Sequence, residues 1–330
     1  MKYVVEPLTH PIEGFYVEIE KIIMAVKGVL QPPGRVIAFP TYIPLDGGFR
    51  RIRRLKESLN YFVKRHPEYY DWFDFAGRRL PAPPLDVVDK IYNPLSVRHV
   101  RRMPPEAEEL KRILIKESGI DERFIGITGS TLLGRCSPKS DIDLIVYGIE
   151  NGRRIYDSMK ELRKRGDLRC LKDYYELRKS RSDSSLPLKT WILVERSKIL
   201  TGMFSRRVYT AKIVPLPFEY WESLNQKCAE IGSVSFIGEV VEDKYSILTP
   251  NRYLVSVEKK LFGEVWEGEV VEVLSVRSRF AEMASCGDRV KVVGRLELVE
   301  LDGKKWKRVF LGNNENDVII PLHLNMDSEI

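Results

Sequence analysis

Residues 126–146 limit the possible folds more than any other part of the sequence. They read Gly-Ile-Thr-Gly-Ser-Thr-Leu-Leu-Gly-Arg-Cys-Ser-Pro-Lys-Ser-Asp-Ile-Asp-Leu-Ile-Val. Short apolar runs predict buried strands over residues 124–128 and 142–146, on either side of a polar turn. Gly129 lets the backbone turn sharply after the first strand. The stretch therefore predicts two strands with polar side chains gathered where one ends and the next begins.

The polar residues between these strands indicate phosphate chemistry. Ser130 is predicted to cap a short helix over residues 131–134, where its hydroxyl and free N–H groups would bind an anion. Asp141 and Asp143 would project from the same side of the second strand, because side chains at i and i+2 share a face. Carboxylates held that close repel by a few kcal/mol. An oxygen-seeking divalent cation would neutralise them, which favours phosphoryl or nucleotidyl transfer.

At these residues the chain resembles the DNA polymerase β superfamily of nucleotidyltransferases. The signature of that family is an apolar strand, Gly-Ser, about ten residues, and Asp-x-Asp or Asp-x-Glu in a second apolar strand. The resemblance covers roughly residues 105–220 and implies metal-assisted transfer of a nucleoside monophosphate from an NTP to a hydroxyl acceptor. It implies Mg²⁺ or Mn²⁺ as cofactor. The residues that it implicates are Asp141 and Asp143 as catalytic metal ligands, and Gly129, Ser130, Arg135, Ser140 and Lys212 as groups near the nucleotide.

The chain departs from the family pattern at Lys212. The family usually places a third carboxylate on a later strand, and here the strand expected over residues 208–214 contains no acid. A lysine at this place could pair with Asp141 and Asp143 and remove a metal ligand. Two readings stay open: a site that works with two carboxylates, or a catalytically inactive nucleotide- or nucleic-acid-binding protein on the same fold.

The pattern of the whole chain predicts an α+β protein of three domains. Residues 1–104 predict a small α+β domain with an antiparallel sheet and a helix over 49–64. Residues 105–220 predict a nucleotidyltransferase-type α/β domain with a short mixed sheet. Residues 221–330 alternate strands with Gly, Asn and Asp turns, which indicates a β-barrel. Further helices are expected over residues 106–118, 153–164 and 186–200.

Positive charge is concentrated in the first two predicted domains. Residues 1–104 hold 17 Lys and Arg against 11 Asp and Glu, and residues 105–220 hold 23 against 17. Residues 221–330 hold 14 against 19, and the whole chain carries a net charge of +7. The basic residues 1–220 are therefore expected to attract polyphosphate or a nucleic acid acceptor. The alternative is a solvated basic surface without a ligand.

Composition excludes several other classes of protein. No stretch approaches the roughly 18–20 apolar residues of a membrane span, and no signal peptide is evident, so a cytoplasmic protein is expected. The four cysteines and four histidines lack the spacing of a zinc site or a disulfide framework. Nine Asn and two Gln, beside abundant Lys, Arg and Glu, are typical of a thermophile.

Overall fold

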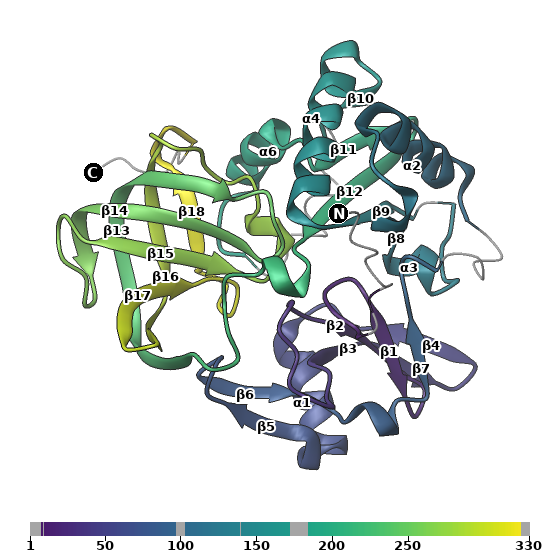
Figure 1. Ribbon diagram of the computed structural model, residues 1–330, viewed down its shortest axis with the longest axis horizontal. Helices are drawn as coiled ribbons and strands as arrows, with labels where there is room; N and C mark the ends of the chain where they lie inside the picture. The colour runs from purple at the N-terminus through teal and green to yellow at the C-terminus, as the bar shows by residue number, and fades with distance from the viewer. Residues whose placement is uncertain (1–7, 9, 97–102, 139, 172–183, 325–330) are drawn as a thin grey trace, which may run out of the picture.

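The computed structural model describes residue 8 and residues 10–96, 103–138, 140–171 and 184–324. Figure 1 shows three lobes, with the barrel at left, the N-terminal lobe at the bottom and the central sheet at upper right. Three hydrophobic clusters form their cores, and the predicted α+β class is confirmed. None of the helices in these ranges combines the length and apolarity needed to cross a membrane.

The N-terminal lobe is an antiparallel sheet with one helix packed on it. Its sheet consists of β1 (Tyr16–Ile19), β2 (Ile22–Val26), β3 (Ala38–Leu45), β4 (Gly48–Arg51) and β7 (Lys90–Tyr92), and its helix is α1 (Leu55–Arg65). The strand order in space is β4-β3-β2-β1-β7. Helix α1 buries Ser58 and Phe62, and the Ser58 hydroxyl donates a 2.8 Å hydrogen bond to the carbonyl of Pro40.

The helix predicted over residues 49–64 begins later than expected. Gly48–Arg51 forms strand β4 instead, with Leu45 paired to Gly48 across the two residues Asp46 and Gly47. Asp-Gly is a favoured two-residue hairpin turn, and Gly47 has the positive φ of 76° that such a turn needs. Tight turn chemistry therefore overrides the apolar periodicity at this point.

A small hairpin links the N-terminal lobe to the barrel. It consists of β5 (Tyr70–Phe73) and β6 (Arg78–Pro81), and lies between the 3₁₀ helices Pro67–Tyr69 and Leu85–Val87. Its turn docks on the start of the barrel, where the amide of Cys228 donates to the carbonyl of Asp74 at 2.8 Å. The side-chain amide of Gln226 donates to the carbonyl of Phe75 at 2.9 Å.

The central lobe is a mixed sheet, as predicted, and the structure gives it five strands, including β10 (Leu168–Arg169) and β11 (Thr201–Phe204), which the sequence did not predict. Its elements are α2 (Pro105–Ser118), a 3₁₀ turn (Glu122–Phe124), β8 (Ile125–Ile127), α3 (Gly129–Leu132), β9 (Ile142–Tyr147), α4 (Ile149–Arg165), β10 (Leu168–Arg169), β11 (Thr201–Phe204) and β12 (Arg207–Val214). The strand order is β10-β11-β12-β9-β8. Only the pair β9–β12 is parallel, so the strands that carry Asp143 and Lys212 lie side by side.

The two faces of β9 pack against different lobes. Successive side chains of a strand alternate between faces, and Ile142, Leu144 and Val146 belong to the core beneath α2 and α4. Ile145 and Tyr147 belong to the core of the N-terminal lobe. Asp143 shares the face of these last two residues, so it projects toward the side that the N-terminal lobe covers.

The C-terminal lobe is the predicted β-barrel. It is built from β13 (Lys227–Tyr245), β14 (Asn251–Phe262), β15 (Val270–Ser275), β16 (Arg289–Leu301), β17 (Lys304–Phe310) and β18 (Val318–Pro321), with 3₁₀ turns at Pro217–Glu219, Ser278–Phe280 and Leu322–Leu324. The order is β13-β14-β15-β17-β16-β18, and the pairing of β13 with β16 closes the ring. Helix α6 (Leu188–Ser197) inserts Trp191 and Val194 into the barrel core.

A buried ion network supports the barrel wall nearest the hairpin. The Arg308 guanidinium is 2% exposed and lies 2.7 Å from a carboxylate oxygen of Glu297, which is equally buried. It also pairs with Glu222. Arg308 and Glu297 are both removed from water. If one of two such charges is deleted, the desolvation free energy of the other is no longer compensated by their ion pair.

The substitution Arg308→Met is expected to lower the free energy of unfolding by about 3–5 kcal/mol, because Glu222 loses its ion-pair partner and Glu297 keeps only Arg295 and Arg78. Denaturant unfolding measures this change. Lys305→Met, on the same strand, removes a surface pair with Glu300 and should change stability by less than about 1 kcal/mol. Equal losses in the two variants would contradict a specific role for the buried network.

Candidate active site

The candidate site lies where α3 meets the start of β9. Asp141 directly precedes β9 and is exposed, whereas Asp143 on the strand is half-buried. The amide of Thr128 donates a 2.9 Å hydrogen bond to the carbonyl of Asp143, which holds the turn beside the strand. Gly129 has a φ of +67°, and any Cβ there would collide with the carboxylate of Asp143. The structure therefore places Gly129 beside Asp143, as the motif predicts.

Ser130 does not cap a helix, contrary to the prediction. Helix α3 begins at Gly129, and its N-cap residue is Thr128, which makes no side-chain capping bond. Ser130 therefore lies within the first turn, half-buried, and its carbonyl accepts a 2.8 Å hydrogen bond from the amide of Arg135. Gly129, the first residue of the helix, has a φ of +67°, which glycine adopts without steric cost.

Ser140 holds together the turn that leads into the acidic pair. Its hydroxyl accepts a 2.8 Å hydrogen bond from the amide of Ser137. Its carbonyl accepts a 2.9 Å hydrogen bond from the guanidinium of Arg207 at the start of β12, and that guanidinium also lies 3.0 Å from Glu106. Ser140 and Arg207 thus fix the approach of the chain to Asp141.

The carboxyl of Asp143 is electrostatically perturbed. Burial raises its pKa most, the negative charge of Asp141 raises it further, and Lys212 and Arg51 lower it, which leaves a pKa of about 6. The two carboxylates therefore act on each other, as the sequence predicted. A neighbouring carboxylate disfavours the charged form unless a proton or a cation relieves the repulsion.

Residues of the N-terminal lobe pack directly onto the strand that carries Asp143. Gly14 has a φ of +98°, and a Cβ there would collide with Ile145, so glycine lets the segment lie flat on β9. The hydroxyl of Thr128 donates to the carbonyl of Gly14 at 2.6 Å. The hydroxyl of Tyr147 donates to the carbonyl of Glu13 at 2.9 Å. These contacts place Glu13 beside the site.

Glu13 is the partner of Lys212. Its carboxylate is 1% exposed and lies 2.9 Å from the Lys212 ammonium and 3.1 Å from that of Lys27. Burial alone would raise the pKa of Glu13, but the two lysines outweigh it and lower the pKa to about 2. The predicted pairing of Lys212 with the aspartates is therefore replaced by a bond to Glu13, and Lys212 influences Asp143 only as a nearby charge.

Arg135 lies against the β3–β4 hairpin of the N-terminal lobe. Its guanidinium is 3.7 Å from the ring centre of Phe49 and 5.6 Å from that of Tyr42. Arg51 lies 5.8 Å from the same Tyr42 ring and acts on the charge of Asp143. The pKa of the Tyr16 phenol is raised by burial and then by Asp143. Cations and aromatic rings of the N-terminal lobe therefore surround the acidic pair.

The donor set fits one hard divalent cation bound by two carboxylates. Among the described residues, no group of three or more His, Cys, Asp and Glu side chains converges. A cation held by two carboxylates would take its other ligands from oxygen atoms of a substrate or of water. Carboxylate oxygens are the ligands that Mg²⁺ prefers, and Mg²⁺ sites commonly use one or two carboxylates plus substrate phosphates. Asp141 and Asp143 meet that description.

The sequence alone missed the residues that the N-terminal lobe contributes. Glu13, Arg51 and Tyr16 lie far from the motif along the chain, and no pattern links them to it. The one available signal was Lys212, because a lysine within an apolar strand needs an acidic partner when it is buried. That signal calls for a carboxylate but does not identify Glu13, which lies 199 residues away.

Comparison with known proteins leaves the chain without a family. No family model matches it. An uncharacterized protein of Methanocaldococcus jannaschii is 20% identical over 209 residues, which cover 61% of this chain and 58% of that protein. The chain thus spans less than two thirds of the length of this relative, and the similarity carries no statement about activity.

The substitution Glu13→Gln should remove a stabilising contribution that depends on pH. A carboxyl with a lowered pKa stabilises the fold above its ordinary pKa of 4.5, and this stabilisation is lost as the pH falls toward about 2. The wild type should therefore be more stable than the variant by about 3 kcal/mol near neutral pH. The difference should shrink between about pH 5 and pH 2, as followed by denaturant unfolding.

Glu161→Gln is the matched control, because Glu161 forms an exposed pair with Lys164 at 2.7 Å. It should leave the stability nearly unchanged at each of these pH values, because an exposed ion pair contributes little. A Glu13→Gln difference that stays constant from neutral to acidic pH would show that Glu13 is not held ionised by its two lysines.

Proposed function

We propose that this chain is a nucleotidyltransferase that moves a nucleoside monophosphate from an NTP to an acceptor hydroxyl with Mg²⁺ or Mn²⁺. The observation that carries the proposal is the placement of Asp143 against Gly129 with Asp141 acting on its charge. A cytoplasmic setting belongs to the same proposal, in keeping with four cysteines that form no disulfide.

The acidic pair would hold the cation, and the neighbouring residues would hold the nucleotide. A divalent cation bound there would draw negative charge from the phosphates and favour attack at phosphorus. Gly129 and Ser130 would approach the phosphates through backbone and hydroxyl groups, because Gly129 has no side chain and lies against the carboxylate of Asp143. Arg135 and Arg51, which lie near the same Tyr42 ring, would supply positive charge as donors to phosphate oxygens.

The reaction forms a bond between the acceptor oxygen and the α-phosphorus of the NTP. The bond from that phosphorus to the bridging oxygen breaks, and pyrophosphate leaves with the electron pair. The proton of the acceptor hydroxyl passes to a base or to water. Positioning and charge stabilisation account for most of the rate in such transfers, and the site residues would provide both.

A second function has its own supporting observation. The strand β12 carries no carboxylate, and Lys212 there is bound to Glu13. Such a site lacks the third acid that the resemblance leads one to expect. It is therefore compatible with a protein that binds nucleotide or nucleic acid without turnover.

Incubation with labelled NTPs, Mg²⁺ or Mn²⁺ and candidate acceptors decides between the two functions. The double variant Asp141→Asn/Asp143→Asn should lose transfer by about 100-fold or more, since it removes the charges that hold the cation. The control Asp157→Asn/Asp167→Asn alters two exposed aspartates on and after α4 and should keep the wild-type rate. Equal rates in the two double variants, or no transfer by the wild type, would favour the binding function.

Two glycines of the motif provide a second test. Gly129→Ala should weaken Mn²⁺ binding, measured by calorimetry, by about tenfold or more, because the new Cβ displaces the carboxylate of Asp143. Gly134 has nearly the same φ, +65° against +67°, and nothing lies within 4 Å of the position that a Cβ would take there. Gly134→Ala shares the backbone strain and should keep Mn²⁺ affinity. Parallel losses in both variants would attribute the effect to strain alone.

A further inference from the structure

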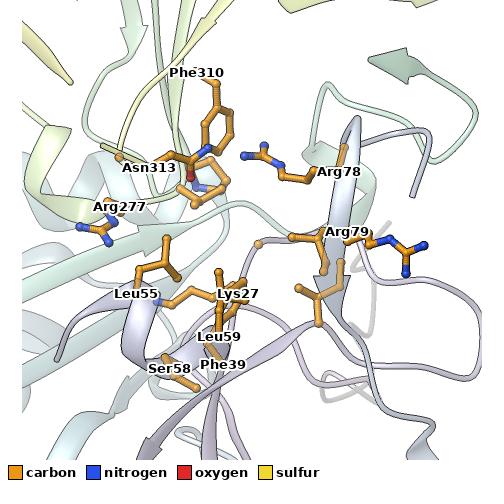
Figure 2. A pocket seen from close by; sticks show the side chains of 18 of the residues that line it. Lys27, Phe39, Leu55, Ser58, Leu59, Arg78, Arg79, Arg277, Phe310 and Asn313 are labelled. Carbon is orange, nitrogen blue, oxygen red and sulfur yellow. The ribbon is translucent and has the colours of Figure 1, made fainter. Parts of the chain in front are cut away.

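A second large site lies away from the acidic pair, between the N-terminal lobe, the β5–β6 hairpin and the barrel. Its volume is about 1110 Å³, above the roughly 300–1,000 Å³ of ordinary small-molecule pockets. Figure 2 shows Arg277 and Asn313 on one side, Arg78 and Arg79 on the other, and Leu55 and Leu59 of α1 below. We refer to this cavity as the interlobe groove.

The interlobe groove is strongly basic. Nine of the residues that line it are Lys or Arg, and the single acid among them is Glu222. Glu222 already pairs with Arg308, and Lys27 pairs with Glu13. Arg53, Arg54, Lys56, Lys64 and Arg79 form no ion pair within the described residues, and their charges give the groove a positive potential that attracts an anionic ligand.

Three of the four cations beside α1 lie where they do not favour the helix. Arg53, Arg54 and Lys56 lie at its N-terminus, and Lys64 lies in its last turn. Positive charge is unfavourable near the N-terminus of a helix because of the helix dipole. The N-cap Arg54 makes no side-chain capping bond. Among the described residues, Arg53, Arg54, Lys56 and Lys64 have no acidic partner within ion-pair distance, so their charges remain available to a ligand.

The wall of the groove formed by the β5–β6 hairpin contributes the guanidinium of Arg78, which has one N–H donor without an acceptor. Arg78 stacks on the ring of Phe310, 3.8 Å from its centre, and lies 3.9 Å from Glu297. The Nε of Arg78 is buried without a hydrogen-bond acceptor in the described part of the chain. A buried donor without an acceptor costs free energy, which an anionic ligand in the groove would recover.

The floor of the groove is apolar and aromatic. Leu55, Leu59 and Val63 recur at helical spacing along α1 and are half-buried, on the stripe next to the buried Ser58 and Phe62. Five aromatic residues also line the groove, Phe39 and Phe310 among them. A ligand that fits must therefore present flat or apolar groups together with negative charge.

We propose that the interlobe groove binds a segment of single-stranded nucleic acid. Phosphates would contact the cations of α1 and the hairpin, and unstacked bases would contact the apolar floor. This combination of cations that follow a backbone with rings that stack on bases is the general mode of single-strand binding. Binding at the groove does not depend on the transfer reaction proposed above.

Other anionic ligands fit fewer of these features. Inorganic polyphosphate would use the cations but not the apolar floor. A duplex keeps its bases stacked and paired, so it could not present them to the floor. An acidic peptide would use charge and some apolar contact but has no flat ring for each negative charge. These ligands therefore serve as competitors in the test.

The experiment measures fluorescence anisotropy of labelled single-stranded RNA and DNA of about 12 nucleotides with the full chain. It is carried out in EDTA and without NTP, so failure of the transfer reaction cannot affect it. Both oligonucleotides should bind, with affinity that falls between about 50 and 200 mM salt. Comparison of the RNA and DNA affinities shows which sugar the groove prefers.

Matched charge reversals locate the site. Lys56→Glu/Lys64→Glu on α1 should weaken binding by about tenfold or more and lower the salt dependence, because phosphate contacts are lost. The control Arg112→Glu/Lys116→Glu makes the same change of charge on exposed positions of α2, outside the groove, and should retain affinity. Thermal unfolding confirms that each variant folds.

The substitution Phe39→Leu tests the apolar floor. It keeps an apolar side chain but removes a ring, so the affinity for the single strand should fall by about fivefold or more with the salt dependence unchanged. The proposal is overturned if neither oligonucleotide binds, or if both double variants bind equally. It is also overturned if polyphosphate or a poly-glutamate peptide of equal charge competes as well as the unlabelled strand.

Discussion

The carboxylate of Glu13, buried between two lysines, is the interaction on which the arrangement of the site depends. A carboxylate removed from water is costly unless cations and hydrogen bonds compensate it. Lys27 comes from the end of β2 and Lys212 from β12, so the compensation is complete only when the N-terminal lobe lies on the central sheet. The same contact that secures the lobe also determines what surrounds the acidic pair.

This arrangement gives Lys212 a different role from the one that its position in the sequence suggests. A lysine next to Asp141 and Asp143 would neutralise them and exclude a cation. Because Glu13 binds the ammonium at 2.9 Å, the repulsion between the aspartates persists, and Asp143 retains a pKa of about 6. Under the proposed function, the Glu13 carboxylate of the N-terminal lobe would thus keep Lys212 from occupying the place of a divalent cation.

The N-terminal lobe also faces both candidate sites. Its β3–β4 hairpin brings Arg51 and Tyr42 to the acidic pair, while α1 forms one wall of the interlobe groove. Lys27 belongs to both regions, since it lines the groove and binds Glu13. Under the two proposals, one side of the N-terminal lobe would bind a polyanion in the interlobe groove, and the other side would cover the acidic pair Asp141 and Asp143.

The sequence by itself determined the local elements and the chemistry of the motif. The apolar runs of β9 and β12, the glycine before the acidic pair and the strand-rich C-terminal third were predicted because they depend on neighbours within a few residues. It mistook the start of α1, where the Asp46-Gly47 turn outweighs periodicity, and the capping role of Ser130, because α3 begins one residue earlier, at Gly129. Only the tertiary structure decided which carboxylate meets Lys212, which lobe covers Asp143, and where the cations of α1 gather. Those outcomes depend on the desolvation of charged groups and on contacts between segments that are far apart in the sequence. A local sequence pattern does not specify which distant segments meet.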